Sequence, residues 1–214
     1  MILYNLETAK TTAEYLLQIK AIKMNPAKPF TWASGWKSPI YCDNRKTLSF
    51  PPIRTFLRQE FVKCINENFK TPDVVAGVAT GGIALGVLVA QDMGLPFVYV
   101  RGEAKGHGLQ NRIEGHVEPG SNVIVVEDLI STGGSSISVV EALREAECNV
   151  VGMVAIFTYG FDVAKKKFKD SKCPLYTLSD YNTIIQTAAE NGIIMEKQIE
   201  TLKEWRQKPD QWGK

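Results

Sequence analysis

The stretch "NVIVVEDLISTGGSS", residues 122–136, decides the fold because it joins three features in a fixed order. It begins with a run of Val and Ile, which predicts a short strand buried on both faces of a parallel sheet. Two acids, Glu127 and Asp128, end the run, and a turn of small residues leads into a segment with helical periodicity. This order predicts an α/β unit that binds a ligand beyond the carboxyl end of the strand.

The turn after the two acids has the composition of a phosphate site. The backbone N–H groups of Ser131 to Ser135 precede the expected helix, where unpaired amides and the helix dipole attract an anion. The turn is neither a Walker A loop, which ends in GK[ST], nor a dinucleotide fingerprint, which needs GxGxxG. The two carboxylates before the turn can accept hydrogen bonds from the vicinal hydroxyls of a sugar and help to hold Mg²⁺. The combined pattern therefore predicts a sugar phosphate as the ligand.

Outside this stretch, apolar strand-like runs alternate with segments of helical period. Strands are expected at 73–79, 96–101, 122–128, 150–159 and 174–181, and helices at 7–22, 51–69, 81–94, 135–148 and 196–208. The helix after the phosphate turn is expected to take Ser136 or a neighbour as its cap. Residues 30–45 differ, since aromatic and β-branched residues broken by Gly35 and Pro39 predict short strands and a turn. The whole pattern predicts an α/β protein with a central, mostly parallel sheet flanked by helices.

Composition argues against several classes of function. A length of 214 residues favours one domain. The net charge is +2, and the cationic run Lys165–Lys169 is predicted to be a solvated helix face, so we expect no nucleic-acid partner. No apolar run approaches the roughly 20 residues of a membrane span, and the start "MILYNLETAK" does not resemble a secretory signal. We therefore expect a cytoplasmic protein without membrane contact. The four cysteines and two histidines lack the spacing of zinc ligands.

One long polar segment interrupts the alternation of strands and helices. Residues 101–122 contain five glycines, both histidines, two arginines and a lysine, and they show no hydrophobic period. A connection of this length inside a compact domain is usually a functional loop or a disordered piece. We predict that it is a charged lid over the ligand site.

These motifs resemble a known family. The run "VVEDLISTGGS" is similar to the motif with which type I phosphoribosyltransferases bind 5-phosphoribosyl 1-diphosphate (PRPP). Within that family "FTWASGWKSPIYCDNRKTLSFP", "YVRGEAKGHG" and "IFTYG" resemble the orotate phosphoribosyltransferases of the compact bacterial kind. The resemblance extends from about Leu16 to the C-terminal helix. It implies the type I phosphoribosyltransferase fold in a single domain, with an N-terminal helix and hood at about 1–50, a core at about 51–214 and a mobile lid at 101–121.

The resemblance also implies a reaction. Members of this family transfer the phosphoribosyl group of PRPP to N1 of orotate, which gives orotidine 5′-monophosphate and pyrophosphate in pyrimidine biosynthesis. Mg²⁺ is the cofactor and is held mainly by PRPP, so no dedicated set of protein ligands is expected. The implied assembly is a homodimer in which the 101–115 loop closes over the active site of the neighbouring subunit.

Site residues follow from the resemblance by position. The residues with implied catalytic roles are Lys105, His107, Glu127 and Asp128. Those implied to bind PRPP are Arg101, Lys105, His107, Glu127, Asp128, Leu129, Ile130, Ser131, Thr132, Gly133, Gly134, Ser135, Thr80 and Gly81. Ser131 is implied to contact orotate, and Lys37 and Arg45 are candidates to bind its carboxylate.

The chain departs from the family pattern at several cationic positions. Some members have lysine where this chain has Ala33, Gly81 and Gly102, and arginine where it has Tyr159. How the carboxylate of orotate and the pyrophosphate are neutralised is therefore open, with Arg45, Arg112 or a second Mg²⁺ as the compensating groups.

Two alternatives to this function remain. A purine phosphoribosyltransferase would keep the PRPP motif, but such enzymes lack the "FTWASGWKSPIY" segment. A PRPP-sensing regulator without catalysis would be expected to carry a nucleic-acid-binding domain or a basic face and to lose the lid. This chain keeps Arg101, Lys105 and His107 in the lid.

Overall fold

A seven-stranded sheet forms the centre of the computed structural model, which describes residues 1–32, 35–102 and 112–212. The strands lie in the order β1 (Ile2–Leu3), β11 (Leu175–Asp180), β10 (Asn149–Thr158), β9 (Asn122–Ile130), β6 (Val74–Val78), β7 (Phe97–Val100) and β8 (Ile113–Glu114). All neighbours pair in parallel except β8, which is antiparallel to β7. The predicted mostly parallel α/β sheet is confirmed.

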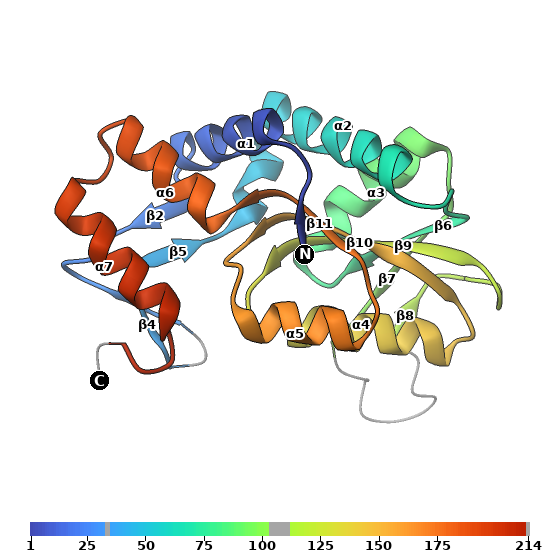
Figure 1. Cartoon of the computed structure of the whole chain (residues 1–214). Coiled ribbons are helices and arrows are strands. Elements are labelled where there is room, and N and C mark those ends of the chain that lie inside the picture. The colour runs from blue at the N-terminus through green and yellow to red at the C-terminus, as the bar shows by residue number, and fades with distance from the viewer. Residues whose placement is uncertain (33–34, 103–111, 213–214) are drawn as a thin grey trace.

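Helices cover both faces of this sheet (Figure 1). One face carries α1 (Leu6–Gln18), α2 (Pro51–Asn68) and α3 (Gly81–Met93), and the other carries α4 (Gly134–Glu145) and α5 (Asp162–Asp170). Along β9, Ile124 and Val126 join the core on the α1–α3 side, whereas Val123 and Val125 join the core on the α4 and α5 side. Because both faces are buried, the strand is a continuous apolar run instead of an alternating one.

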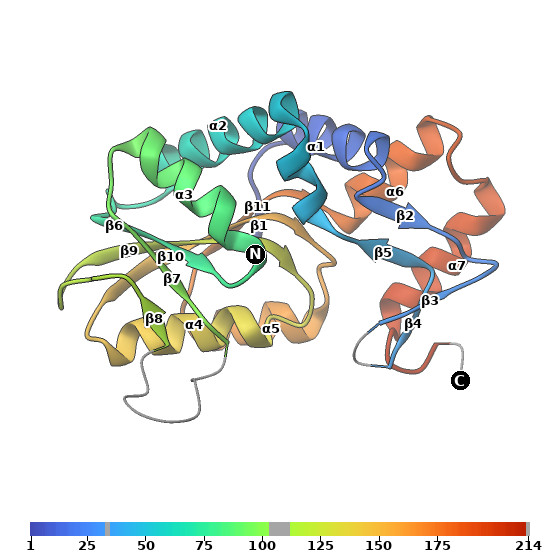
Figure 2. The same cartoon turned by 180° about the vertical axis from the view of Figure 1, so that it is seen from behind.

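A hood stands beside the carboxyl end of the sheet (Figure 2). It contains two small antiparallel pairs, β2 (Ile22–Met24) with β5 (Ile40–Cys42) and β3 (Phe30–Thr31) with β4 (Lys37–Ser38), followed by the 3₁₀ helix η1 (Asn44–Ser49). The predicted short strands and turn in this region are confirmed. Two further helices, α6 (Tyr181–Glu190) and α7 (Glu196–Gln207), bring the C-terminal part of the chain to the same region.

Trp205 of α7 fastens the C-terminal helix to the hood. Its side chain is fully buried, and its Nε1–H donates a hydrogen bond to the carbonyl oxygen of Lys37 at 3.0 Å. The indole ring packs against Trp32 and Tyr159, with centroids 5.6 and 5.7 Å away. The hood is therefore assembled from both ends of the chain. The predicted boundary between hood and core near residue 50 stays a prediction.

The helix after the phosphate turn begins earlier than the sequence predicts. Its N-cap is Gly133, which has a φ of +74°, so the predicted cap at Ser136 is wrong. The physical reason is that the Ser136 hydroxyl is turned inward and donates to Glu127 Oε2 at 3.0 Å. A glycine cap leaves the first amides of α4 without a side-chain partner, so they remain available to a ligand.

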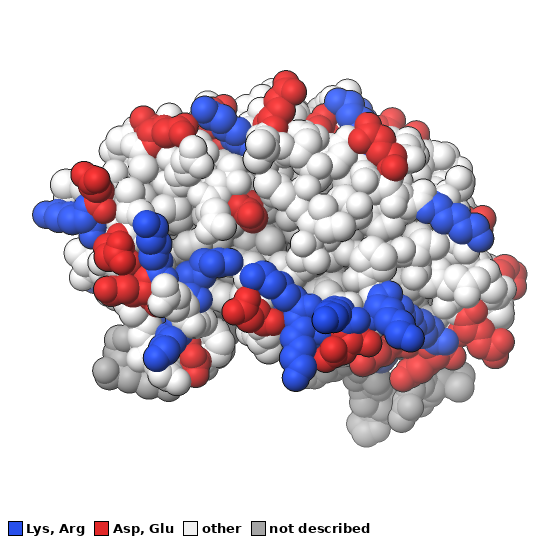
Figure 3. Space-filling model, viewed as in Figure 1, with Lys and Arg blue, Asp and Glu red and all other residues white. Residues whose placement is uncertain are grey.

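Charged side chains are spread over the surface shown in Figure 3, with Lys and Arg gathered along α5 and acids among them. The predicted solvated helix is the exposed side of α5, where Lys165 forms an ion pair with Asp162 at 2.9 Å. Among the described residues, no helix has the combined length and apolarity of a membrane span.

Candidate active site

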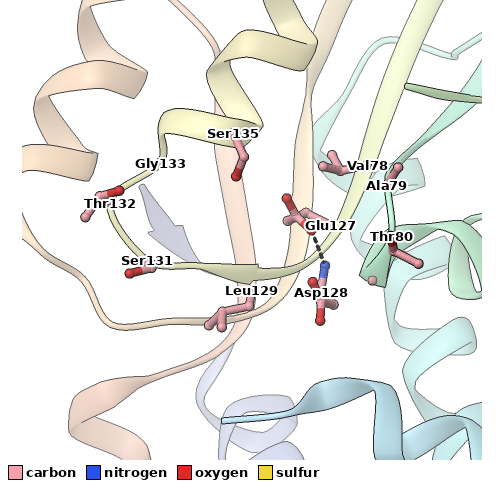
Figure 4. A pocket seen from close by; sticks show the side chains of 11 residues that line it. Val78, Ala79, Thr80, Glu127, Asp128, Leu129, Ser131, Thr132, Gly133 and Ser135 are labelled. Carbon is pink, nitrogen blue, oxygen red and sulfur yellow. Dashed lines mark hydrogen bonds between the residues drawn. The ribbon is translucent and has the colours of Figure 1, made fainter. Parts of the chain in front are cut away.

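The two acids lie at the carboxyl end of β9, facing a cavity of about 280 Å³ (Figure 4). Glu127 is buried, and its two carboxylate oxygens accept hydrogen bonds from the Asp128 backbone N–H at 2.9 Å and from Ser136 Oγ at 3.0 Å. Asp128 is half-buried and lines the cavity beside it. The pair is thus held by the strand end and by the first turn of α4.

Burial changes the acidity of both carboxyls. Loss of solvent raises the pKa of Glu127 well above its usual value, and the nearby Asp128 carboxyl raises it further. The pKa of Asp128 is also raised by burial, although its contact with Glu127 and the charge of Arg45 act in the opposite direction. Glu127 is therefore the member of the pair that holds a proton more tightly when no ligand is bound.

The phosphate turn curves around one side of the same cavity, and the acids lie between it and Thr80 (Figure 4). The predicted residues that line the cavity are Thr80, Gly81, Glu127, Asp128, Leu129, Ser131, Thr132, Gly133 and Ser135. Three of the described residues that were predicted to bind PRPP do not line it, and the first of them, Arg101, lies at the start of the predicted lid. Ile130 is fully buried in the core between the sheet and α4 and α5, and Gly134 is the first residue of α4.

Gly81 touches the acid pair from the opposite loop. A Cβ atom added at Gly81 would lie 2.3 Å from Asp128 Cγ and Oδ1, far inside van der Waals contact. With Asp128 in this place, position 81 has no room for any side chain, including the lysine expected from other family members. A side chain at position 81 would therefore require the Asp128 carboxylate to move.

A second cavity, of about 380 Å³, opens under the hood. Its lining residues are Thr31, Trp32, Tyr41, Cys42, Leu129, Ser131 and Tyr159. Trp32 and Tyr159 lie with ring centroids 5.0 Å apart, and burial raises the pKa of Tyr159, so its hydroxyl stays neutral. The two rings are tilted by 48° and Tyr159 is 1% exposed, so the half-buried Trp32 ring is the one that offers a flat apolar surface to a planar heterocycle. Trp32, Tyr41 and Cys42 were not singled out from the sequence, where an aromatic residue gives no sign of whether it lines a cavity or fills the core.

The two predicted carboxylate partners differ in their placement. Lys37 Nζ donates to Thr31 Oγ1 at 2.8 Å, and Thr31 lines the second cavity. Arg45 forms an ion pair with Asp43 at 2.7 Å and is exposed. Neither side chain lines either cavity. Lys37 is at the rim of the aromatic cavity, whereas the charge of Arg45 acts on Asp128 from outside.

Asn44 connects the hood to the acid pair, although only its neighbour Arg45 was predicted as a site residue from the sequence. Its side chain is 1% exposed, and its Nδ2 donates to the backbone carbonyl of Asp128 at 2.6 Å. Its Oδ1 lies 3.1 Å from Cys42 Sγ, which donates to it. Since Cys42 lines the aromatic cavity, a single buried amide joins the wall of one cavity to the acid of the other.

The lid is described only at its two ends. Lys105 and His107 lie outside the described residues. Arg101 forms an ion pair with Glu114 at 2.9 Å. Arg112 donates from Nη2 to Ser138 Oγ at 2.7 Å and from Nε to the Arg101 carbonyl at 3.1 Å, so it fixes the base of the lid.

The donor set fits a magnesium ion that is held mainly by its substrate. Carboxylate oxygens are ligands that Mg²⁺ prefers, and Asp128 presents one carboxylate to the cavity. Within residues 1–32, 35–102 and 112–212 there is no cluster of three or more His, Cys, Asp or Glu side chains that could enclose a metal. Both oxygens of Glu127 are already used by protein donors.

Comparison with known proteins agrees with this geometry. Residues 54–190 match the family described as the phosphoribosyl transferase domain. Orotate phosphoribosyltransferase of Bacteroides fragilis is 58% identical over 200 residues, which are 94% of each chain. That of Porphyromonas gingivalis is 52% identical and covers 95% of this chain and 97% of its own. The crystal structure of orotate phosphoribosyltransferase from Aeropyrum pernix superimposes with a TM-score of 0.73 at 26% identity, over 86% of this chain and 99% of that one.

An acid pair at a strand end, followed by a phosphate turn on this fold, defines a class of enzyme, and the chain belongs to the phosphoribosyltransferase family. Within that class it is a member of the orotate phosphoribosyltransferases, which are pentosyltransferases of pyrimidine biosynthesis.

Proposed function

We propose that the chain binds PRPP in the cavity of the acid pair and orotate in the aromatic cavity under the hood, and joins them at N1 of orotate. The observation that carries this proposal is that the two cavities share Leu129 and Ser131. A ribose held by the acids and a base held in the aromatic cavity would therefore meet above these two residues. Such positioning converts an encounter of two substrates into a reaction within one complex.

In this proposal the acid pair and the turn bind different parts of PRPP. The 5′-phosphate binds the amides at the start of α4 and the hydroxyls of Ser131 and Ser135. The 2′- and 3′-hydroxyls of ribose bind Glu127 and Asp128. As pyrophosphate leaves, carbon 1 of ribose gains positive charge, and the half-exposed Asp128 carboxylate lies on the side where this charge develops. Thr80 and Gly81 line the side of the cavity opposite the turn and are proposed to bind the pyrophosphate.

Mg²⁺ bound to PRPP would neutralise charge on the departing pyrophosphate, with Asp128 as the nearest carboxylate of this chain. For orotate, we propose that the half-buried ring of Trp32 stacks on the base and that Ser131 and the rim lysine, Lys37, bind its polar edge. Lys37 is 2.8 Å from the Thr31 hydroxyl, so a small movement of its flexible chain brings the ammonium to the cavity.

We further propose that Arg101, Lys105 and His107 bring positive charge to pyrophosphate when the lid closes, and that the lid acts on the site of a second subunit in a homodimer. A closed lid would exclude water, which otherwise competes for the reactive ribosyl cation. A cytoplasmic location is supported by the four cysteines, all of which are free thiols, as expected in a reducing compartment.

The reaction itself is tested by following the ultraviolet absorbance of orotate in the presence of PRPP and Mg²⁺. Consumption of orotate with release of pyrophosphate is expected. If orotate is untouched while adenine or hypoxanthine is converted, the enzyme is of the purine type. If PRPP binds and no base is converted, the chain is a regulator.

The lid and the dimer are tested together by mixing two inactive variants. Lys105→Ala is expected to lower turnover by about 10²-fold, the size typical of a group that stabilises transition-state charge. Asp128→Asn disables the cavity itself. If lids act across subunits, mixed dimers contain one site with an intact lid and an intact acid, and activity returns. A demonstrated mixed dimer that stays inactive would contradict the shared site.

A further inference from the structure

Helix α5 lies directly under the phosphate turn. A Cβ atom added at Gly133 would lie 3.2 Å from the ring of Phe168 and 3.5 Å from Ala164, so these two residues form the floor of the turn. They are four residues apart in α5 and therefore share one side of the helix. Lys167 precedes Phe168, and its Nζ reaches to 3.3 Å from the place of a Cβ atom on Gly134. An ammonium group thus stands beside the first residue of α4.

Among the described residues, Lys167 has no ion-pair or hydrogen-bond partner, whereas Lys165 of the same helix is paired with Asp162. The Lys167 side chain is half-buried. A cavity of about 610 Å³ on the outer side of the turn is lined by both Lys167 and Thr132. The side chain therefore faces space that is continuous with the phosphate turn.

The charges around Lys167 act in both directions while the site is without an anion. Asp162 and Asp210 line the same cavity and Lys167 lies in the last turn of α5, which favour its ammonium group, whereas Arg206 and the start of α4 oppose it. The N-terminus of a helix carries partial positive charge, so a cation beside the start of α4 is repelled. The turn itself supplies only neutral donors, and the nearest charged groups in its cavity are the acids Glu127 and Asp128. A bound phosphate dianion would be attracted both by the dipole of α4 and by the ammonium group of Lys167.

We propose that Lys167 binds the 5′-phosphate of PRPP and of the nucleotide product from the outer side of the turn. The proposal rests on the proposed function, which places that phosphate at Ser131–Ser135. Lys167 then supplies a fixed positive charge on the protein itself for the phosphomonoester, separate from the cations of the lid. It contacts neither the base nor the pyrophosphate.

The test compares Lys167→Ala with Lys167→Arg and with Lys166→Ala, a neighbouring exposed lysine that lies on the solvent side of α5. Binding of ribose 5-phosphate and of pyrophosphate is measured by calorimetry, and KM values are measured in both reaction directions. Loss of a charge-assisted contact should weaken ribose 5-phosphate binding in Lys167→Ala by roughly tenfold to a hundredfold. The KM values of PRPP and of orotidine 5′-monophosphate should rise by a similar factor, because both carry the 5′-phosphate.

Pyrophosphate binding and the KM of orotate should stay unchanged in Lys167→Ala, and Lys167→Arg should restore most of the loss. Unchanged ribose 5-phosphate affinity in a folded Lys167→Ala protein would overturn the proposal, and so would an equal loss in Lys166→Ala, which would indicate general surface charge. A loss of pyrophosphate binding would place Lys167 at the other end of PRPP and also overturn it. If the wild-type protein binds ribose 5-phosphate through Lys167 but does not convert orotate, the proposed reaction fails and this inference stands.

Discussion

Replacement of Gly81 by alanine should displace the Asp128 carboxylate and lower activity, although neither acid is itself substituted. The new methyl group would lie 2.3 Å from Asp128 Cγ and Oδ1, while ordinary van der Waals contact begins near 3.4 Å. The carboxylate must therefore move by about 1 Å or rotate away. A displacement of this size at a reacting centre costs on the order of 10²-fold in rate, which corresponds to about 2.7 kcal/mol of transition-state stabilisation.

The assay is the steady-state rate of orotate consumption at several PRPP concentrations. We expect kcat/KM for PRPP to fall by about 10²-fold in Gly81→Ala, with little change in the KM of orotate, because the base cavity does not include Gly81. The melting temperature should fall only slightly, because the clash is with the end of one half-buried side chain that can rotate away.

The same substitution made in an Asp128→Ala protein separates the clash with Asp128 from any other effect of the methyl group. In an Asp128→Ala protein the clash is absent, so adding Gly81→Ala should not weaken PRPP binding further. Wild-type kcat/KM in the single variant would refute the reasoning. An equal loss of PRPP affinity in both backgrounds would show that the methyl group acts on the ligand and not on Asp128.

Two further predictions concern the residues that hold the acids. Asn44→Ala removes the donor to the Asp128 carbonyl, which should lower the free energy of unfolding by about 1–3 kcal/mol and raise the KM of PRPP. Urea denaturation and steady-state kinetics measure these two effects. If neither value changes, Asn44 does not support the acid pair. Glu127 has a pKa raised above its ordinary 4.5 by burial, so the folded state favours its protonated form and loses stability as pH rises through the folded pKa. Glu127→Gln, which has no charge, should therefore gain stability relative to the wild type as pH rises above the ordinary pKa of 4.5, whereas a pH-independent difference would show that the burial of this carboxyl has no such effect.

The sequence by itself determined the parts of the site that are contiguous in the chain. Apolar residues of β9, two acids and a small-residue turn follow one another directly, so local preferences suffice to predict strand, acid pair and phosphate turn, and the PRPP motif then indicated the family. The cap of α4 was wrong because the Ser136 hydroxyl turns inward to Glu127. The first helix, expected at 7–22, ends at Gln18, and the strand β2 begins at Ile22. The roles of all the predicted site residues in binding and catalysis stay predictions.

Tertiary structure alone decided the remaining contacts, because each joins residues that are distant in sequence and depends on which side chains are buried together. Trp32, Tyr159 and Trp205 meet only when α7 returns to the N-terminal hood. Asn44 reaches the carbonyl of Asp128 across 84 residues, whereas only its neighbour Arg45 was predicted as a site residue. The contact of Gly81 with the Asp128 side chain and the position of Lys167 beside the first residue of α4 likewise come only from the folded chain, because the packing of α3 against β9 and of α5 under the turn brings these residues together.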